Sequence, residues 1–173
     1  MNLERDRKIA YSVAVVTTVL GAGLDQLTKY LVVQGIPYHG EIKVIPGFFS
    51  LVHIRNKGAA FGFLSGSQHG FAPTLFLILT VAATLFVVYL LHRHIRGSWL
   101  ITVSISLILG GAVGNLIDRI RFGSVVDFLD VYIKSAHWPS FNMADSLITV
   151  GGILLLAKLL FSPQAFLNSS PPE

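Results

Sequence analysis

Two long stretches without a charged residue constrain this chain more than any other feature. Residues 71–91 and 97–117 contain no Asp, Glu, Lys or Arg. A membrane-spanning helix needs about 20 consecutive apolar residues, so each stretch is long enough to cross a bilayer. Because the link at 92–96 is short, we expect these two helices to be antiparallel neighbours.

Two further segments complete the predicted set of spanning helices, one near each end of the chain. Residues 9–33 and 141–161 are mainly apolar, with charged residues toward their ends. A cleavable signal peptide is the alternative for the first, but its apolar run is long for one. Only 13% of the residues are charged, against about 25% in soluble domains. The sequence therefore predicts an α-helical membrane protein in which residues 1–173 form one integral domain.

The two long connections, residues 34–70 and 118–140, have the features of extended structure. The first contains EIKVI, a Pro46-Gly47 turn and FFSLVHIRN, which are typical of a β-hairpin. The second contains SVVDFLDVYI, in which alternate residues would share one face. With four helices, both connections lie on the same side. We expect a small antiparallel β platform and a loop on one membrane surface.

The basic residues favour one orientation in the membrane. They are densest in the short segments at the termini and at 92–96, and such segments tend to stay in the cytoplasm. We therefore expect cytoplasmic termini and an extracytoplasmic platform. The net charge is +4, but its Lys and Arg residues are spread along the chain, which argues against nucleic-acid binding.

Three clusters place polar side chains where lipid would otherwise lie. They are Asp25 with Lys29, Asn115 with Arg119, and Asp127 with Asp145. Charged residues in such places often mark functional sites, although each cluster has a structural alternative. Asp25 and Lys29 could form an interfacial salt bridge, Arg119 could contact lipid phosphates, and Asp145 could cap a helix with Asn142. Asp118 and Arg121 could also pair locally.

Other kinds of catalytic site lack support in the sequence. Cysteine is absent, and the six histidines show no metal-binding spacing. There is no Gly-x-Ser-x-Gly motif and no glycine-rich phosphate loop. We therefore expect neither a metal nor another cofactor, and acid–base chemistry by carboxylates remains.

Five motifs, in order along the chain, resemble those of bacterial lipoprotein signal peptidases (signal peptidase II). They are Asp25-x-x-Thr-Lys29, Asn56-x-Gly-Ala-Ala-Phe61, Gly114-Asn115-Leu116-x-Asp118-Arg119, Val125-Val126-Asp127-Phe128 and Phe141-Asn142-x-Ala-Asp145-Ser146. The resemblance extends from about residue 10 to residue 161. It implies an aspartic endopeptidase of the inner membrane that needs no cofactor. Its substrates would be diacylglyceryl-modified prolipoproteins, cut just before the lipidated cysteine.

The same resemblance assigns roles to particular residues. Asp127 and Asp145 would be the catalytic pair, and Asn56, Asn115, Arg119, Asn142, Asp25 and Lys29 would support them. It also implies inhibition by cyclic peptides of the globomycin type. We expect contact with membrane lipids and a monomeric protein. Because a helix N-terminus favours a charged carboxyl and apolar neighbours disfavour one, we expect Asp145 to be the base and Asp127 to hold the proton.

The sequence also suggests a flexible segment over the site and an alternative function. Phe61 and the glycines around it, Gly58 and Gly62, suggest a flap over the site. The alternative function is a non-enzymatic channel or transporter subunit, which four helices with buried carboxylates would also fit. That alternative is less favoured, because the polar clusters gather toward one membrane face rather than the midplane.

Overall fold

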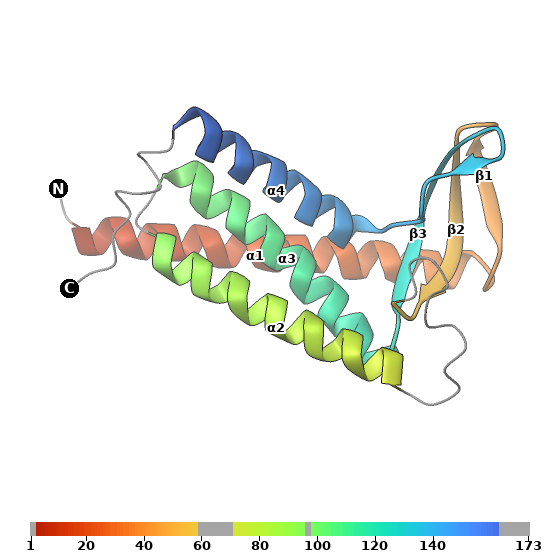
Figure 1. Cartoon of the computed structure of the whole chain (residues 1–173), viewed down its shortest axis with the longest axis horizontal. Coiled ribbons are helices and arrows are strands. Elements are labelled where there is room, and N and C mark those ends of the chain that lie inside the picture. The colour runs from red at the N-terminus through yellow and green to blue at the C-terminus, as the bar shows by residue number, and fades with distance from the viewer. Residues whose placement is uncertain (1–2, 59–70, 96–97, 163–173) are drawn as a thin grey trace.

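The computed structural model describes residues 3–58, 71–95 and 98–162, in which four long helices meet a small sheet (Figure 1). The elements are α1 (Leu3–Gly35), β1 (Glu41–Ile45), β2 (Phe49–Asn56), α2 (Phe71–His94), α3 (Trp99–Phe122), β3 (Val125–Ile133), β4 (Ala136–His137) and α4 (Met143–Phe161). The helices lie side by side, and the sheet stands at one end of the bundle. The start of α1 and the end of α4 lie at the opposite end.

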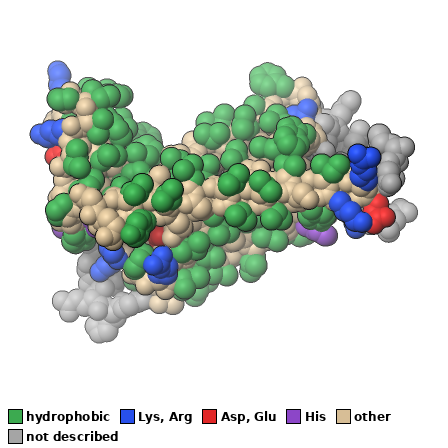
Figure 2. All heavy atoms as spheres, turned by 180° about the vertical axis from the view of Figure 1, so that it is seen from behind, with side chains coloured by type: hydrophobic (Ala, Val, Ile, Leu, Met, Phe, Trp, Pro, Cys, Tyr) green, Lys and Arg blue, Asp and Glu red, His purple; other side chains and the backbone are tan. Residues whose placement is uncertain are grey.

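All four helices are long and apolar enough to cross a membrane, with mean hydropathy between 1.3 and 2.5 in the most apolar part of each. Large apolar side chains point outward: Leu20 is 67% exposed, Leu85 64% and Leu160 75%. Figure 2 shows such side chains covering the helical part of one face. A surface of this kind suits lipid rather than water. The predicted four-helix membrane architecture is therefore confirmed.

Several helices extend beyond their apolar segments. The first helix was expected to begin at residue 9 and the third to end at 117, whereas α1 begins at Leu3 and α3 continues to Phe122. Charged residues at these ends can stay helical outside the hydrocarbon layer, where water or lipid headgroups solvate them. The additional turns bring the end of α3 to the sheet end of the bundle.

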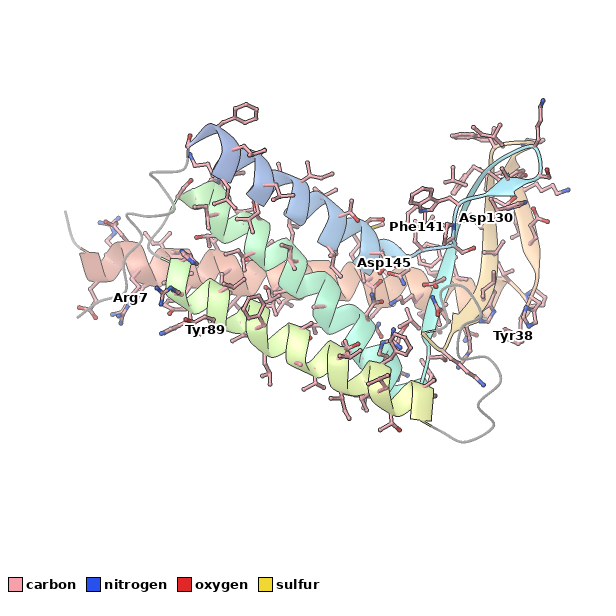
Figure 3. The ribbon with its side chains drawn as sticks, in the orientation of Figure 1. Arg7, Tyr38, Tyr89, Asp130, Phe141 and Asp145 are labelled. Carbon is pink, nitrogen blue, oxygen red and sulfur yellow. The ribbon has the colours of Figure 1, made fainter. Side chains whose placement is uncertain are left out.

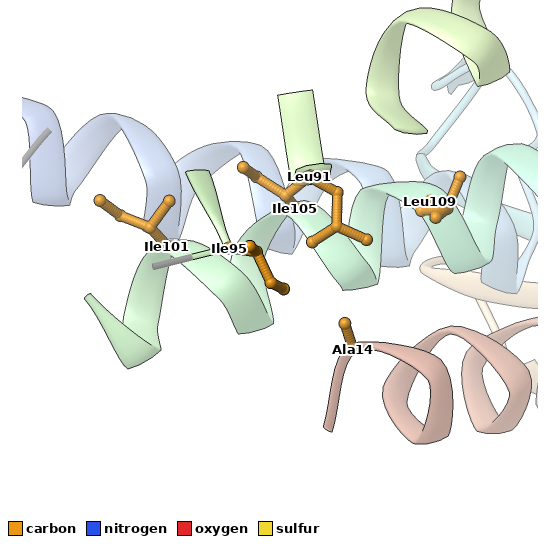
Figure 4. Packing of buried hydrophobic residues seen from close by; sticks show 6 residues of the cluster. All are labelled: Ala14, Leu91, Ile95, Ile101, Ile105 and Leu109. Carbon is orange, nitrogen blue, oxygen red and sulfur yellow. The ribbon is translucent and has the colours of Figure 1, made fainter. Parts of the chain in front are cut away.

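Small residues allow the helices to approach closely. A Cβ atom added to Gly110 of α3 would lie 3.1 Å from the carbonyl oxygen of Thr18 in α1. One added to Gly111 would collide with the carbonyl oxygen of Ala144 in α4. Away from the sheet, a buried apolar cluster joins α1, α2 and α3 (Figure 4). Its members are Ala14, Leu91, Ile95, Ile101, Ile105 and Leu109. Close packing of this kind stabilises helices in lipid, where burial of apolar surface contributes little.

The platform is an antiparallel sheet with the strand order β1-β2-β3-β4. Gly123 ends α3 in a left-handed conformation with φ of 64°, and its N–H donates to the carbonyl oxygen of Arg119 at 3.0 Å. Glycine adopts this conformation without strain, so the chain can turn directly from α3 into β3. The predicted antiparallel platform is confirmed, and β3 is the strand that connects it to the bundle.

Candidate active site

Asp127 and Asp145 come together where β3 meets the start of α4. Asp127 lies on β3 opposite Ile54 of β2. Asp145 is in the first turn of α4, and Figure 3 shows it at the end of that helix close to β3. Just before α4, the Phe141 N–H donates to the carbonyl oxygen of Leu129 at 3.1 Å. This bond holds the start of α4 against β3 and brings the two aspartates together.

Asn142 binds both aspartates at once. It is the N-cap of α4: its side-chain oxygen accepts the Asp145 N–H at 3.0 Å, and its backbone N–H donates to Asp145 Oδ2 at 3.2 Å. Its remaining group, Nδ2, donates to Asp127 Oδ1 at 2.7 Å. The residue is fully buried. The predicted helix cap is therefore present, and the capping residue also links Asp145 to Asp127.

Asp127 is buried, with an amide donor on each carboxylate oxygen. Besides the bond from Asn142, Asn56 Nδ2 donates to Oδ2 at 3.0 Å. The Asn56 side-chain oxygen accepts the Gly58 N–H at 2.8 Å, which fixes the orientation of this amide. Burial, the largest cause, and the charge of Asp145 together raise the pKa of Asp127 to about 6, although the two amide donors and the charge of Lys29 act in the opposite direction. The environment therefore favours a proton on Asp127.

Asp145 is held by a chain of hydrogen bonds that begins in α1. Asn115 of α3 donates from Nδ2 to Asp145 Oδ1 at 2.9 Å. The side-chain oxygen of Asn115 in turn accepts from Lys29 Nζ at 2.9 Å. Because an ammonium group can only donate, this contact fixes which end of the Asn115 amide faces Asp145. Lys29 thus acts on Asp145 through Asn115 and does not contact it.

Lys29 is also the centre of a buried ion cluster. Its ammonium lies 2.9 Å from Asp25 Oδ2 and 3.0 Å from Asp118 Oδ2, and all three side chains are at most 4% exposed. The predicted Asp25–Lys29 pair is confirmed. The expected pairing of Asp118 with Arg121 is wrong. The packing of α1 on α3 brings Lys29 to Asp118, and this buried carboxylate gains more from a buried ammonium than from an exposed guanidinium.

The ion cluster also anchors the backbone beside Asp145 and beside Asp127. The Ala144 N–H, next to Asp145, donates to Asp25 Oδ1 at 2.8 Å. The Val126 N–H, next to Asp127, donates to Asp118 Oδ2 at 3.0 Å. The cluster therefore fixes the position of the two chain segments that carry Asp127 and Asp145, the pair that we call the dyad.

Gln26 is a member of this network that the sequence analysis missed. Its side-chain amide donates to Asp118 Oδ1 at 2.9 Å and to the Gly114 carbonyl oxygen at 3.1 Å. A polar residue directly after Asp25, in an otherwise apolar helix, could have indicated this role.

Arg119 has a different environment from the other predicted site residues. Its Nε and Nη1 atoms are buried and have no hydrogen-bond partner among the described residues. The guanidinium lies 5.4 Å from the centre of the Phe76 ring and acts on Asp127, Asp145 and Asp118 through its charge. Nearby, Gly58 has φ of 96°, and a Cβ atom there would collide with the Phe76 ring. A glycine at this position lets the chain leave β2 alongside α2.

The flap expected at Phe61 and Gly62 lies outside the described residues. Within residues 3–58, 71–95 and 98–162, no three His, Asp or Glu side chains are grouped so that they could hold a metal ion. The arrangement that is present, two carboxylates held by amide donors, suits proton sharing and transfer.

Comparison with known proteins decides the family. The sequence model described as "Signal peptidase (SPase) II" matches residues 17–161. The chain belongs to the signal peptidase II family. This is a family of aspartic peptidases, and membership favours a peptidase over the channel or transporter subunit considered above.

Individual relatives agree with this assignment. The chain is 46% identical over 149 residues to the lipoprotein signal peptidase of Syntrophotalea carbinolica, covering 86% of this chain and 91% of that one. It is 50% identical over 137 residues to the lipoprotein signal peptidase of Cupriavidus necator, covering 79% and 77%. A solved structure of a bacterial membrane enzyme superimposes with a TM-score of 0.73 at 35% identity and 94% coverage of both chains.

Proposed function

We propose that this protein removes signal peptides from diacylglyceryl-modified prolipoproteins by cutting the peptide bond just before the lipidated cysteine. The observation that carries the proposal is the pair of aspartates joined through Asn142, one of them buried with a raised pKa. Family membership supplies the substrate class. The protein would act as a single integral membrane unit and as a monomer.

The two aspartates divide the chemistry of hydrolysis. Asp145, ionised, takes a proton from a water molecule as the water oxygen attacks the scissile carbonyl carbon. Asp127, protonated, donates to the carbonyl oxygen as negative charge develops there. The tetrahedral intermediate then collapses: Asp145 passes the proton that it took from water to the peptide nitrogen, and the carbon–nitrogen bond breaks. The former carbonyl oxygen returns its proton to Asp127 as the product carboxyl group forms. Both aspartates exchange protons within one cycle, so the titration belongs to the pair.

The surrounding residues position this pair. Asn56 and Asn142 hold Asp127, while Asn115 holds Asp145 under the control of Lys29. Asp25 fixes the start of α4 through the Ala144 N–H. Arg119 adds positive charge without a hydrogen bond to either carboxylate, which suits a role in limiting repulsion between them.

The site lies at the sheet end of the bundle, where the spanning helices end (Figure 1). A signal peptide is embedded in lipid and its modified cysteine carries two acyl chains, so the scissile bond would lie near this level. Cleavage there avoids exposing the chains to water, which costs about 0.8 kcal/mol per CH₂ group. We place the platform on the extracytoplasmic side and both termini in the cytoplasm. Cyclic peptides of the globomycin type would inhibit by occupying the dyad.

Cleavage of a purified diacylated prolipoprotein by aspartate variants tests the proposal. Asp127→Asn and Asp145→Asn should each lower the rate by at least about 10²-fold, since each removes an acid–base group. Asp130→Asn is the matched control: this aspartate is also buried on β3 but contacts His137 at 3.0 Å instead of the dyad. The control should keep near wild-type activity. A dyad variant with a tenth of wild-type activity would contradict the assignment.

The lipid on the substrate provides a second arm of this experiment. The unmodified prolipoprotein should be cleaved far more slowly than the diacylated form, because binding energy from the acyl chains acts at the reacting bond. Equal rates for the two forms would show that the enzyme does not use the lipid.

A further inference from the structure

A second concave region lies on the flank of the bundle where the ends of α1 and α3 meet the sheet. It is a cleft of about 230 Å³, and its rim includes Tyr30 and Gln34 of α1, Arg55 of β2, and Arg121 and Phe122 of α3. The buried ion cluster forms part of its floor through Lys29 and Asp118.

This cleft is separate from the dyad, because it lies on the opposite face of β3. Val126 lines the cleft. Phe128, two residues further along the strand, packs against Val32 and Ile36 of α1. Successive side chains of a strand point to opposite faces, so Asp127 points away from this flank. A ligand in the cleft would therefore not occupy the substrate position.

The rim of the cleft carries two arginines without an acidic partner. The Arg55 guanidinium lies 4.6 Å from the centre of the Phe122 ring and that of Arg121 lies 5.0 Å from it, so one aromatic ring holds both. Neither forms a salt bridge with any residue in the described part of the chain. The Lys29 ammonium is already paired with two carboxylates, so it adds no free positive charge to the cleft. The rim therefore presents two positive charges for an external anion.

The cleft lies at the depth of lipid headgroups. α3 ends at Phe122, at the rim itself, and its last turn with Arg119 and Arg121 follows the uncharged stretch that ends at residue 117. The candidate span in α1 has 32 residues and would be about 48 Å long, against about 30 Å for the hydrocarbon layer, so its last turns reach the headgroup region. Figure 2 shows basic side chains toward the sheet end of the bundle on the face that it draws.

An apolar path leads from the cleft toward the membrane interior. Tyr30 is 60% exposed, and Leu27, one turn earlier on the same face of α1, is 55% exposed. Apolar side chains below a pair of cations match the two parts of a phospholipid: acyl chains in the hydrocarbon layer and a phosphate above them.

We propose that this cleft binds an anionic membrane phospholipid, with its phosphate on Arg55 and Arg121 and its acyl chains along α1. A guanidinium can donate two parallel hydrogen bonds to a phosphate, which a single ammonium group cannot match. Basic pockets beside spanning helices are known to bind anionic headgroups. This proposal does not depend on peptidase activity, and its test measures lipid binding alone.

Native mass spectrometry of the purified full-length protein in detergent tests the proposal. Phosphatidylglycerol and phosphatidylethanolamine with identical acyl chains are added in equal amounts. The wild type should retain the anionic lipid about tenfold more than the zwitterionic one. Arg55→Gln and Arg121→Gln should each lower this preference about fivefold, and the double variant should remove it. Arg121 is exposed, so its single variant remains informative if the double variant does not fold.

Controls make each outcome decisive. Lys43→Gln removes an exposed positive charge from β1, away from the cleft, and should leave the preference unchanged. Arg121→Lys keeps the charge but loses the paired donors, and should bind with intermediate preference. The proposal is overturned by equal retention of both lipids by the wild type, or by an unchanged preference in the Arg121→Gln variant. Displacement of the lipid by excess inorganic phosphate would instead assign the cleft to a soluble anion.

Discussion

Two pairs of carboxylates lie close together at the sheet end of the bundle, and their partners differ. Asp25 and Asp118 share the Lys29 ammonium and each accept a backbone N–H. Asp127 and Asp145 share a neutral residue, Asn142, and receive amide donors. One pair is joined by a cation and the other by an amide.

The difference explains how one residue type can serve structure in one place and chemistry in another. A carboxylate held by an ammonium and a backbone N–H is fixed in place by an opposite charge as well as by hydrogen bonds. Amide donors hold a carboxyl group in position without supplying the charge that would fix its ionisation. The pair joined by Asn142 can therefore keep one proton between its two members, which hydrolysis requires.

Removing the positive charge of Lys29 should produce the largest change in stability. Lys29→Met keeps the length of the side chain but leaves Asp25 and Asp118 buried without a compensating charge. We expect a loss of about 3–5 kcal/mol in the free energy of unfolding, measured by denaturation in detergent micelles. Lys8→Met is the control, since its salt bridge with Glu4 is exposed, and it should leave the stability unchanged. Equal stability of the Lys29 and Lys8 variants would show that the cluster does not depend on its charge.

The raised pKa of Asp127, in the pair joined by Asn142, should make the stability of the protein depend on pH. The pKa of Asp127 is about 6 in the folded protein against an ordinary value of 3.8, so the folded state binds more protons between these values. Stability should therefore fall as the pH rises from about 4 to about 6, by about 3 kcal/mol from this group. Thermal unfolding of the wild type and Asp127→Asn at pH 4 and pH 7 isolates this contribution. Parallel pH dependence in the two proteins would contradict the raised pKa.

A smaller loss of stability should follow from adding a methyl group at Gly114, beside the Asp25 carboxylate of the ion cluster. A Cβ atom added to Gly114 would collide with the Asp25 carboxylate, whereas one added to Gly23 would meet nothing within 4 Å. We expect Gly114→Ala to destabilise the protein by about 1–3 kcal/mol, because the carboxylate must move from its partners. Gly23→Ala should be neutral or slightly stabilising. Thermal unfolding measures both effects. Equal changes in the unfolding temperature of the two variants would contradict this prediction.

The local features of the molecule could be predicted from the sequence. The uncharged runs indicate the helices because the bilayer sets their length, and the strand patterns indicate the platform. The pairing of Asp25 with Lys29 and the capping of α4 by Asn142 also follow from spacing along one helix. Roles for the eight predicted site residues came from the family resemblance rather than from residue physics.

Contacts between different helices and strands could not be predicted from sequence patterns. Spacing on α3 suggested Arg121 as the partner of Asp118, whereas the approach of α1 provides Lys29. The bond from Asn142 to Asp127 depends on how α4 meets β3, and no periodicity encodes that. Such contacts are set by the closeness of packing, which depends on small residues such as Gly111 and Gly114.

The capping of α4 has a consequence for how the protein matures. Asn142 reaches Asp127 only while it also starts the helix, so the dyad is assembled only when α4 has begun at the correct residue and docked on β3. A newly made chain that has inserted α1 to α3 but not yet docked α4 lacks both the link from Asn142 to Asp127 and the placement of Asp145 beside β3. The two aspartates would then meet only as the last helix takes its place.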